Sequence, residues 1–536
     1  MIERQTETDI VVYGATAAGV MACVASKRLN PDLRVTLLEP GWHVGGMVSG
    51  GLSYTDLGDP RTVGGLAREF YDRVERHYGA RLVDDFAGPE PHLAENILCQ
   101  MLSEAKVEVR FGEQLESVQK TAGRIACLQT VEGWAYASGV FIDASYEGDL
   151  MAGAGIPYSL GRDGSQAYGE DAAFAGLQPV RPGKHNFIGL DRSYLLSPYS
   201  DDGRLLAHIN PIPLEAQGPV GCGDGKLMAF QHRLSLTDSP ENKVDWPEPP
   251  GYDPAEYELL VKLIAAYGSD VQLHNLVGLI KNVPGNKIDG NSIFAFSLNR
   301  FGGDNREYVE ASHKRRQEIT ADHRRYEQGL LYTLAHDRRL PRPLRQQADA
   351  YGPCKDEFAD TGHWPHQLYV REARRMLGAY VLTQHDIHPG LPLAPCPPTP
   401  RRHADAVLMG SYNIDIREVQ RTWTMLLEYH NQPVVVNEGY LSRPVRPYQV
   451  PYRCFVPPED SCNNLLVPVC ASMSHVAFAS YRMETPYMMA GHAVGVAAAL
   501  ALENGSSVQA AGRPEDGLLD TYQQLLRQQG QVLNLA

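Results

Sequence analysis

The stretch that decides the fold reads Asp9-Ile10-Val11-Val12-Tyr13-Gly14-Ala15-Thr16-Ala17-Ala18-Gly19. Residues 10–13 are apolar and rich in β-branched side chains, which predicts a buried parallel strand. A glycine turn and a segment of helical composition to residue 28 follow, and residues 35–38 predict a second strand. The stretch therefore opens a βαβ unit, which is the setting in which a glycine-rich turn binds a dinucleotide.

Each position of this turn has a physical task. Gly14 permits the tight turn, and Gly19 lets the helix pack close to the strand. The first helical turn, with Ala17 and Ala18, offers free N–H groups to a pyrophosphate. Glu39, after the second strand, is placed to accept hydrogen bonds from a ribose. Thr16 stands where the fingerprint has its middle glycine, so a purely structural turn is the alternative.

The residues after Glu39 favour FAD over NAD. Two glycine pairs follow closely, and backbone without Cβ atoms can approach a flat ring. A flexible surface loop is the other interpretation. The residues that we expect at the cofactor here are Pro40, Gly45, Gly46, Met47, Gly50, Gly51 and Leu52.

Composition limits the class of protein. The 536 residues are 43% hydrophobic and carry a formal net charge of −15, which disfavours nucleic acid or an anionic membrane as partner but allows a local basic pocket. The longest apolar run, residues 493–502, is too short to span a bilayer. Nine scattered cysteines without a CxxC pair, and a polar N-terminal segment, predict a cytoplasmic protein with reduced thiols. A homo-oligomer stays possible.

Several longer motifs resemble one known family, the FAD-dependent oxidoreductases related to the glutathione-reductase-type flavoproteins. The motifs occur in the family's order and cover most of the chain: residues 39–47, 141–150, 368–376, 411–417, 464–468, 474–478 and 482–484. The resemblance implies that Ala144 and Ser145 contact FAD and that the backbone near Leu115 contacts the adenine. It also implies that the helix over 487–502, with Met488 and Gly491, directs its N-terminus at the flavin, close to Ser474.

The predicted fold class is α/β, with a Rossmann-like FAD-binding domain and an inserted mixed α/β substrate domain. We expect the FAD domain at residues 1–160 and 445–505, the substrate domain at 161–444, and a helical tail at 506–536. Long polar helices are predicted over 308–336 and 368–384, and an amphipathic helix over 518–533.

Five residues are candidates for catalysis. His475 is the first candidate for a proton acceptor, although a histidine there also suits a structural hydrogen bond. Arg482 and Glu484 precede the flavin-facing helix and either bind substrate or flavin or pair with each other. Tyr369 and Arg371 come from the middle of the chain, where an arginine in a pocket would select a carboxylate or a phosphate and a solvated helix face is the alternative.

Other features limit these inferences. The family often has histidine where this chain has Arg417, and Lys287-Ile288-Asp289 departs from its Lys-Thr-Asp pattern, so the substrate is in doubt more than the cofactor. His43, before the glycine pairs, is a possible point of covalent attachment to the flavin. The histidine pairs 363/366 and 385/388 have no clear third ligand, so we expect no metal.

The sequence thus predicts an FAD-dependent oxidoreductase that acts on a small organic substrate by hydride transfer to or from flavin. A flavin-dependent monooxygenase that uses oxygen is the first alternative. A flavoprotein without catalytic activity is the second.

Overall fold

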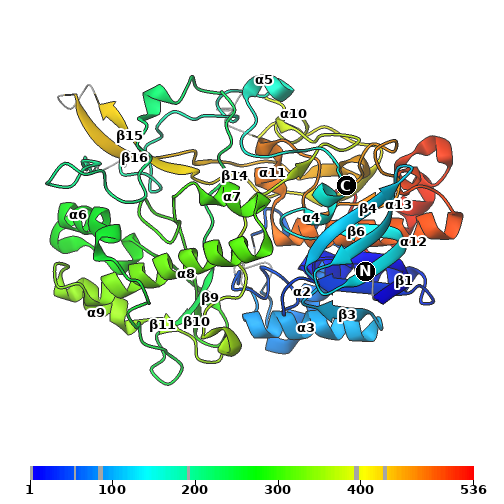
Figure 1. Cartoon of the computed structure of the whole chain (residues 1–536), viewed down its shortest axis with the longest axis horizontal. Coiled ribbons are helices and arrows are strands. Elements are labelled where there is room, and N and C mark those ends of the chain that lie inside the picture. The colour runs from blue at the N-terminus through cyan, green and yellow to red at the C-terminus, as the bar shows by residue number, and fades with distance from the viewer. Residues whose placement is uncertain are drawn as a thin grey trace.

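The structure is a computed structural model, and it describes residues 4–53, 56–82, 88–189, 194–390, 397–426 and 431–535. Figure 1 shows a lobe of sheet and helices at the right and a second, looser lobe at the left. The long helix α8, His313–His336, runs from the left lobe towards the right one.

The right-hand lobe is built on a seven-stranded sheet. Its central strand β1 pairs in parallel with β2 on one side and β6 on the other, while β3 and β19 extend the parallel part. Antiparallel pairing of β6 with β5 and of β5 with β4 adds a meander. The strands are β1 (Arg4–Tyr13), β2 (Val35–Glu39), β3 (Glu108–Phe111), β4 (Leu115–Thr121), β5 (Arg124–Thr130), β6 (Trp134–Asp143) and β19 (Leu465–Leu466).

Both faces of β1 are covered, which explains its unbroken apolar run. Ile10 and Val12 pack in the core on one side of the sheet, and Val11 and Tyr13 pack in a separate core on the other side. A strand with two buried faces needs apolar side chains at every position rather than at alternate ones. The predicted buried parallel strand, and the helix and second strand after it, are confirmed.

Helices cover this sheet, and two of them, α1 from the first part of the chain and α12 from the last part, pack against each other. The helix α12 lies directly against α1, because a Cβ atom on Gly491 would come within 2.1 Å of the Ala18 carbonyl oxygen. One on Gly495 would come within 2.3 Å of the Ala22 oxygen. The helices are α1 (Ala17–Leu29), α2 (Gly65–Tyr78), α3 (Pro91–Glu104), α4 (Asp149–Gly153), α11 (His475–Tyr481), α12 (Glu484–Asn504) and α13 (Leu519–Gln528).

By length and composition, α12 is the one described helix that is apolar enough to cross a membrane. Within the protein, however, 94% of its apolar window is buried. Packing against α1 and the sheet therefore accounts for its composition.

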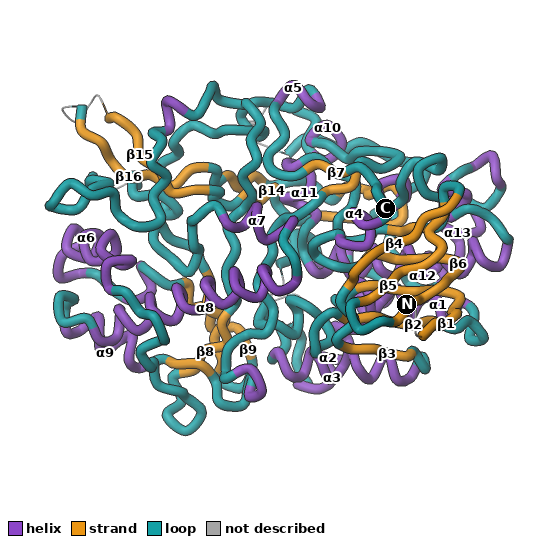
Figure 2. Tube along the Cα trace, in the orientation of Figure 1, coloured by secondary structure: helices purple, strands orange, loops and turns teal. Residues whose placement is uncertain are grey.

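The middle of the chain contains short strands and long loops, as Figure 2 shows. Its largest sheet has four strands in the order β11-β8-β10-β9, and a second core lies between this sheet and the helices α6, α8 and α9. The helices are α5 (Ser165–Tyr168), α6 (Glu258–Tyr267), α7 (Asp304–Glu310), α9 (Arg342–Ala350) and α10 (Gln384–Ile387). The strands are β7 (Tyr158–Ser159), β8 (Leu234–Thr237), β9 (Gly278–Val283), β10 (Lys287–Asn291), β11 (Gly352–Pro353), β12 (Arg375–Met376), β13 (Ala406–Gly410), β14 (Ile414–Ile416), β15 (Gln420–Leu426), β16 (Gln432–Glu438), β17 (Leu441–Arg443) and β18 (Tyr448–Pro451).

The prediction of a helix over residues 368–384 is wrong. The segment is extended, and its only regular structure is the short strand β12. The backbone N–H of Tyr369 donates to the Gln231 oxygen at 2.8 Å, so this part of the chain pairs with another segment. Arg371 and Arg375 consequently share no helix face. Buried partners elsewhere in the molecule override the helical composition.

The contact between α1 and α12 can be tested with Gly491→Ala. Alanine favours a helix interior by about 1 kcal/mol over glycine, so the variant gains stability unless the added methyl group overlaps α1. We expect a net loss of about 3 kcal/mol in the free energy of unfolding, measured by urea denaturation. The control is Gly505→Ala at the end of the same helix. There φ is 59° but nothing lies within 4 Å of the added atom, so about 1 kcal/mol is expected. Equal losses would contradict the close contact.

Candidate functional site

A cavity of about 630 Å³ lies between the first glycine turn and the helix α8. One wall follows the carboxyl ends of the parallel strands, which is where ligands bind in open α/β sheets. On this wall the lining residues are Tyr13, Gly14, Thr16, Glu39, Pro40, Gly41, Trp42, His43, Gly46, Gln114, Ser145, Tyr146, Glu147 and Asp149.

The glycine turn is fixed by the residues directly after β6, the strand that lies beside β1 in the sheet. Gly14 has φ of 97°, and a Cβ atom there would lie 2.8 Å from the Ser145 nitrogen. The Thr16 hydroxyl donates to the Ala144 oxygen at 2.8 Å and accepts from the Gly19 N–H at 3.2 Å. The departure from the glycine fingerprint is thus an N-cap that ties α1 to β6.

Glu39 closes the same end of the cavity. One carboxylate oxygen accepts the Ala15 N–H and the other the Gly41 N–H, each at 2.7 Å. These bonds fix the carboxylate at the end of β2 and leave lone pairs for the hydroxyl groups of a ligand. Burial raises the pKa of Glu39 to about 7, against the opposing effect of the two N–H groups.

The opposite wall is one face of α8, which the sequence indicated only as a polar helix. Its lining residues recur every three or four positions, which is the spacing of a single helix face. They are His313, Arg316, Gln317, Thr320, Ala321 and Arg324. The three-to-four-residue spacing of these polar side chains was the feature of the sequence from which this wall could have been predicted. Part of the predicted substrate domain thus lies against the predicted cofactor site.

Two arginines on this face differ in their partners. Arg316 forms an ion pair with Asp149 across the cavity wall. Arg324 donates to the Thr361 oxygen at 3.0 Å and forms no ion pair with any residue that the structure describes. Arg324 is therefore the cation of this face that is free to pair with a phosphate.

Histidines also line the cavity, among them His43, His232 and His366. His232 is buried, and its Nδ1 lies 2.7 Å from a carboxylate oxygen of Glu327. His43 stacks on His366 with ring centroids 3.8 Å apart. The two nitrogens of His43 face Glu95 and Asp360, each at 3.2 Å. The hydrogen bond to Glu95 raises the pKa of His43 despite partial burial.

The glycine pairs after Glu39 pack on protein rather than on solvent. The Met47 N–H donates to the Tyr146 hydroxyl at 2.8 Å, and that hydroxyl donates to Glu484 at 2.7 Å. Burial raises the pKa of Glu484 to about 8. A Cβ atom on Gly51 would lie 1.9 Å from the Arg233 oxygen, so the predicted close approach is made to backbone of the middle region.

The residues predicted to bind the cofactor fall into two groups. Those that line the cavity are Gly14, Thr16, Glu39, Pro40, Gly46 and Ser145. The others are not among the described lining residues of this cavity: Ala17, Ala18, Gly19, Gly45, Met47, Gly50, Gly51, Leu52, Leu115, Ala144, Ser474, Met488 and Gly491. Leu115, for example, donates its N–H to the Tyr13 hydroxyl at 3.1 Å.

Three of the predicted catalytic residues lie together in a buried cluster. Arg482 donates to the Tyr369 hydroxyl at 3.2 Å and pairs with Asp415 at 2.9 Å. The guanidinium of Arg371 lies 4.8 Å from the centre of the Tyr369 ring. Arg482 and Glu484 do not pair with each other, because each has another partner.

Of the two positions that depart from the family pattern, Arg417 lies beside this cluster, 3.4 Å from Glu418, and Ile288 is buried in the second core instead. Asp289, which the family pattern shares, forms an ion pair with Arg233. Arg371 has neutral hydrogen-bond partners, the Ala229 oxygen and the Asn299 side chain. Burial, and repulsion from Arg417 and Arg482, lower the pKa of Arg371 to about 9.

His475 lies apart from this cluster. Its Nδ1 is 2.7 Å from Glu372, which also pairs with Arg375. The buried Nε2 atom makes no hydrogen bond to a described residue. His475 does not appear in the described walls of the 630 Å³ cavity, so the geometry supports the structural interpretation of this histidine better than the catalytic one.

One group of side chains has the spacing of a metal site: Glu90, His92 and Glu357. The ammonium group of Lys287 lies 2.7 Å from Glu90 and 2.6 Å from Glu357. The lysine thus supplies the positive charge that these carboxylates need.

The wall residues fit a dinucleotide. The turn at Gly14 leaves no room for a side chain, Thr16 at the N-cap of α1 lines the cavity, and Glu39 and Arg324 provide an acceptor and a cation at its two walls. A cavity between a Rossmann-like turn and a polar helix thus has the groups that FAD requires, and the motifs of the sequence imply the same cofactor.

Glu39 predicts a pH dependence of FAD binding. A ribose hydroxyl donates to the ionised carboxylate, so bound FAD lowers a pKa that is about 7 without ligand. Affinity should therefore be full above pH 8 and decline below pH 7, by at most about tenfold per pH unit. Glu39→Gln should bind about tenfold more weakly at pH 8 and lose the pH dependence. Fluorescence titration measures both, with Glu104→Gln on the surface as control. A flat wild-type profile would refute the role of Glu39.

Arg324→Gln should weaken FAD binding by about tenfold, because it removes a charge-assisted bond to a phosphate, and should reduce the dependence of affinity on salt. Arg315→Gln is the matched control: the same helix and the same change of charge, but paired with Glu307 outside the cavity. If both variants bind FAD alike, the α8 face is not a phosphate-binding wall.

Comparisons with known proteins add the family. No curated protein matches this chain. Solved structures that resemble it include the L-proline dehydrogenase from P. horikoshii, with 14% identity over 30% of this chain and 59% of that one at a TM-score of 0.24. Another is the OxyS anhydrotetracycline hydroxylase from Streptomyces rimosus, with 15% identity over 30% and 36% at a TM-score of 0.22. The match covers between 36% and 66% of the first four solved structures.

A family model describes far more of the chain than any of these structures. The model for "FAD dependent oxidoreductase" matches residues 9–516, from the first strand to the segment after α12. Together with the Rossmann-type sheet and the cavity at its carboxyl edge, this match shows that the chain belongs to the FAD-dependent oxidoreductase family and that FAD is its cofactor.

Proposed function

We propose that this enzyme is a dehydrogenase or oxidase of a small organic substrate that carries a carboxylate, with bound FAD as the hydride acceptor. The observation that carries the proposal is Arg371, a buried guanidinium without an ion-pair partner among the residues described. A buried cation is stable only when it is paired, so a site that keeps one is suited to an anionic ligand.

Two paired segments connect Arg371 with the cofactor cavity. Gln231 forms an antiparallel bridge with Tyr369, which aligns residues 229–232 with residues 368–371. At one end of this pair His232 and Leu368 line the FAD cavity. At the other end Arg371 donates to the Ala229 oxygen. Arg371, which would bind the carboxylate of the substrate, is therefore three residues along the same extended segment from Leu368 in the wall of the FAD cavity.

His232 supplies the base in this proposal. Oxidation of an alcohol or amine requires an acceptor for its proton, and a neutral imidazole suits that task. Glu327 holds Nδ1 at 2.7 Å and thereby orients the ring, which leaves Nε2 for proton exchange. The sequence placed the base at His475, which packs with Glu372 and Arg375 instead.

The substrate class is tested by anaerobic bleaching of the flavin. We expect 2-hydroxy acids or amino acids to reduce it, and their amides to reduce it at least about tenfold more slowly, because only the acids pair with Arg371. Arg371→Gln should abolish this preference. Equal rates with acids and amides would refute the carboxylate. Bleaching by NADPH alone would favour a monooxygenase, and no bleaching by any reductant a non-catalytic flavoprotein.

The base is tested by stopped-flow flavin reduction with the best substrate. His232→Gln should slow reduction by about 10²- to 10⁴-fold without loss of FAD. His475→Gln should leave the reduction rate within about threefold and lower the melting temperature instead, since it breaks a buried contact with Glu372. The reverse result would return the catalytic role to His475.

A further inference from the structure

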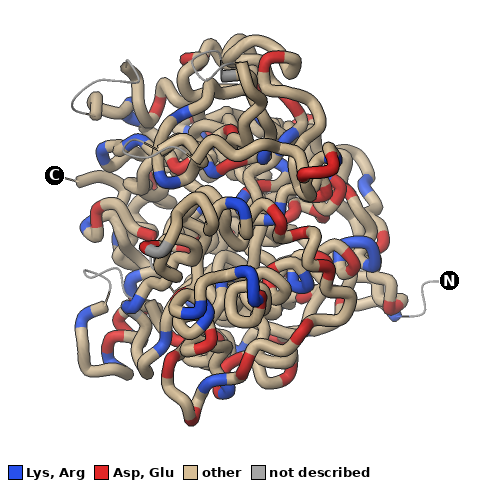
Figure 3. The backbone as a smooth tube through the Cα atoms, turned by 90° about the vertical axis from the view of Figure 1, so that its left-hand side faces the viewer, with Lys and Arg blue, Asp and Glu red and all other residues tan. Residues whose placement is uncertain are grey.

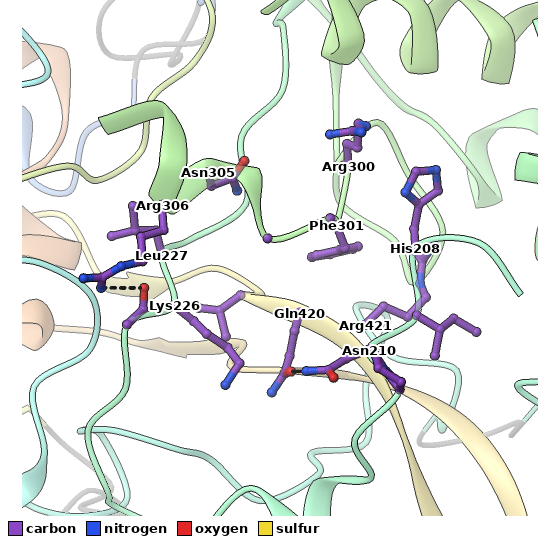
Figure 4. Close-up of a pocket in the computed structure, with 16 residues that line it drawn as sticks. His208, Asn210, Lys226, Leu227, Arg300, Phe301, Asn305, Arg306, Gln420 and Arg421 are labelled. Carbon is purple, nitrogen blue, oxygen red and sulfur yellow. Dashed lines mark hydrogen bonds between the residues drawn. The ribbon is translucent and has the colours of Figure 1, made fainter. Parts of the chain in front are cut away.

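A second cavity, of about 710 Å³, lies in the middle region of the chain. Figure 4 shows side chains from separate segments around it, with Lys226 and Arg306 on one side and Arg300 and His208 on the other. Its walls come from four segments: residues 208–211, 225–227, 300–303 with 305–306, and 419–421.

The charge of this cavity opposes the charge of the protein. Acidic residues outnumber basic ones in the chain by 64 to 49, and Figure 3 shows the two signs interspersed along the backbone. The cavity is lined by Lys226, Arg300, Arg306 and Arg421, and none of its described lining residues is acidic. Such a local excess of cations attracts anions.

Arg421 is the most informative of these cations. It is 1% exposed and forms no ion pair with a described residue. Its hydrogen bonds go to neutral groups, the Asn437 side chain at 3.2 Å and the Ala295 oxygen at 3.1 Å. Burial lowers the pKa of this guanidinium. The guanidinium also lies 4.6 Å from the ring centre of Phe296 and 5.0 Å from that of Phe301, which offsets part of the cost of its burial. An anion in the cavity would supply the counter-ion that the described residues do not provide.

The other cations differ in how they are held. Lys226 and Arg300 pair with Asp224 and Asp304, which fixes their positions in the wall. Arg306 lies at the exposed rim, where it donates only to the Gly225 oxygen at 3.3 Å and has no carboxylate partner among the described residues.

Polar atoms around the cavity also lack partners. The buried Nε of Arg300 and the buried Oδ1 of Asn305 make no hydrogen bond to a described residue. Apolar side chains complete the walls, namely Ile209, Leu227, Phe301 and Val419, all of them buried. The cavity therefore offers positive charge, unused hydrogen-bonding groups and an apolar surface to one ligand.

We propose that this cavity binds an organic oxyanion with an apolar body, its carboxylate or phosphate group on the arginines and its body on Phe301 and Leu227. This cavity is separate from the FAD cavity, because the described linings of the two cavities share no residue. The short helix α7 contributes Arg306 to the lining of this cavity and Tyr308 to the lining of the FAD cavity. The proposal holds whichever compound the flavin oxidises.

The test is calorimetric titration of the FAD-loaded enzyme with benzoate, phenyl phosphate and benzyl alcohol, a neutral compound of similar shape. Saturable binding of at least one anion is expected, about tenfold or more tighter than that of the alcohol and weaker at higher salt. Arg306→Glu should weaken the anion by at least about tenfold. Arg204→Glu, an exposed arginine of the same region with the same change of charge, should not.

The affinities of benzoate and phenyl phosphate identify the head group. Tighter binding of benzoate indicates a carboxylate site, and tighter binding of phenyl phosphate indicates a phosphate site. Equal affinity for benzyl alcohol, unchanged binding to Arg306→Glu, or no saturable binding of either anion would overturn the proposal. Loss of binding in Arg371→Gln but not in Arg306→Glu would also overturn it, because the anion would then occupy the flavin-side cluster. These binding measurements can be interpreted even if no substrate reduces the flavin in the anaerobic bleaching test, since none of them measures turnover.

Discussion

The fold depends on the contact between α1 and α12. Gly491 and Gly495 allow the backbone of α12 to touch the carbonyl groups of Ala18 and Ala22, a distance that a Cβ atom would prevent. The Ser26 hydroxyl adds a bond to the Gly495 oxygen at 2.9 Å. Because α1 begins at the turn that faces the cofactor, this contact also fixes the direction of that turn. The wall of the FAD cavity thus requires both ends of the chain.

Buried ion pairs organise the middle region, where regular structure is sparse. Arg162 pairs with Asp224 and with Glu438, each at 2.6 Å, and thereby joins segments that are distant in sequence. Each such pair is costly to desolvate and even more costly to break, so it favours one arrangement of the loops. Against this pattern, Arg371 and Arg421 are exceptions, since each is buried with neutral partners only.

The sequence predicted what depends on local chemistry. The strand at residues 10–13, the turn at Gly14 and the helix after it follow from periodicity and backbone freedom, and the family match confirms the cofactor. The extended conformation of residues 368–376 depends on Gln231 and on Asp149 and Asp163, which lie far away in the chain. No local pattern encodes such partners, and for the same reason the position of α8 at the wall of the FAD cavity could not be assigned from its polarity alone.

The pairing of α1 with α12 has a consequence for biogenesis. The groups that meet at Ser26 and Gly495 are 469 residues apart, so the ribosome releases the second partner long after the first. Until then, the face of α1 that packs on α12 is uncovered, and an exposed apolar face of a nascent chain favours aggregation and chaperone binding. The support that α12 gives to the turn at Gly14 is therefore complete only after residues 484–504 have been synthesised.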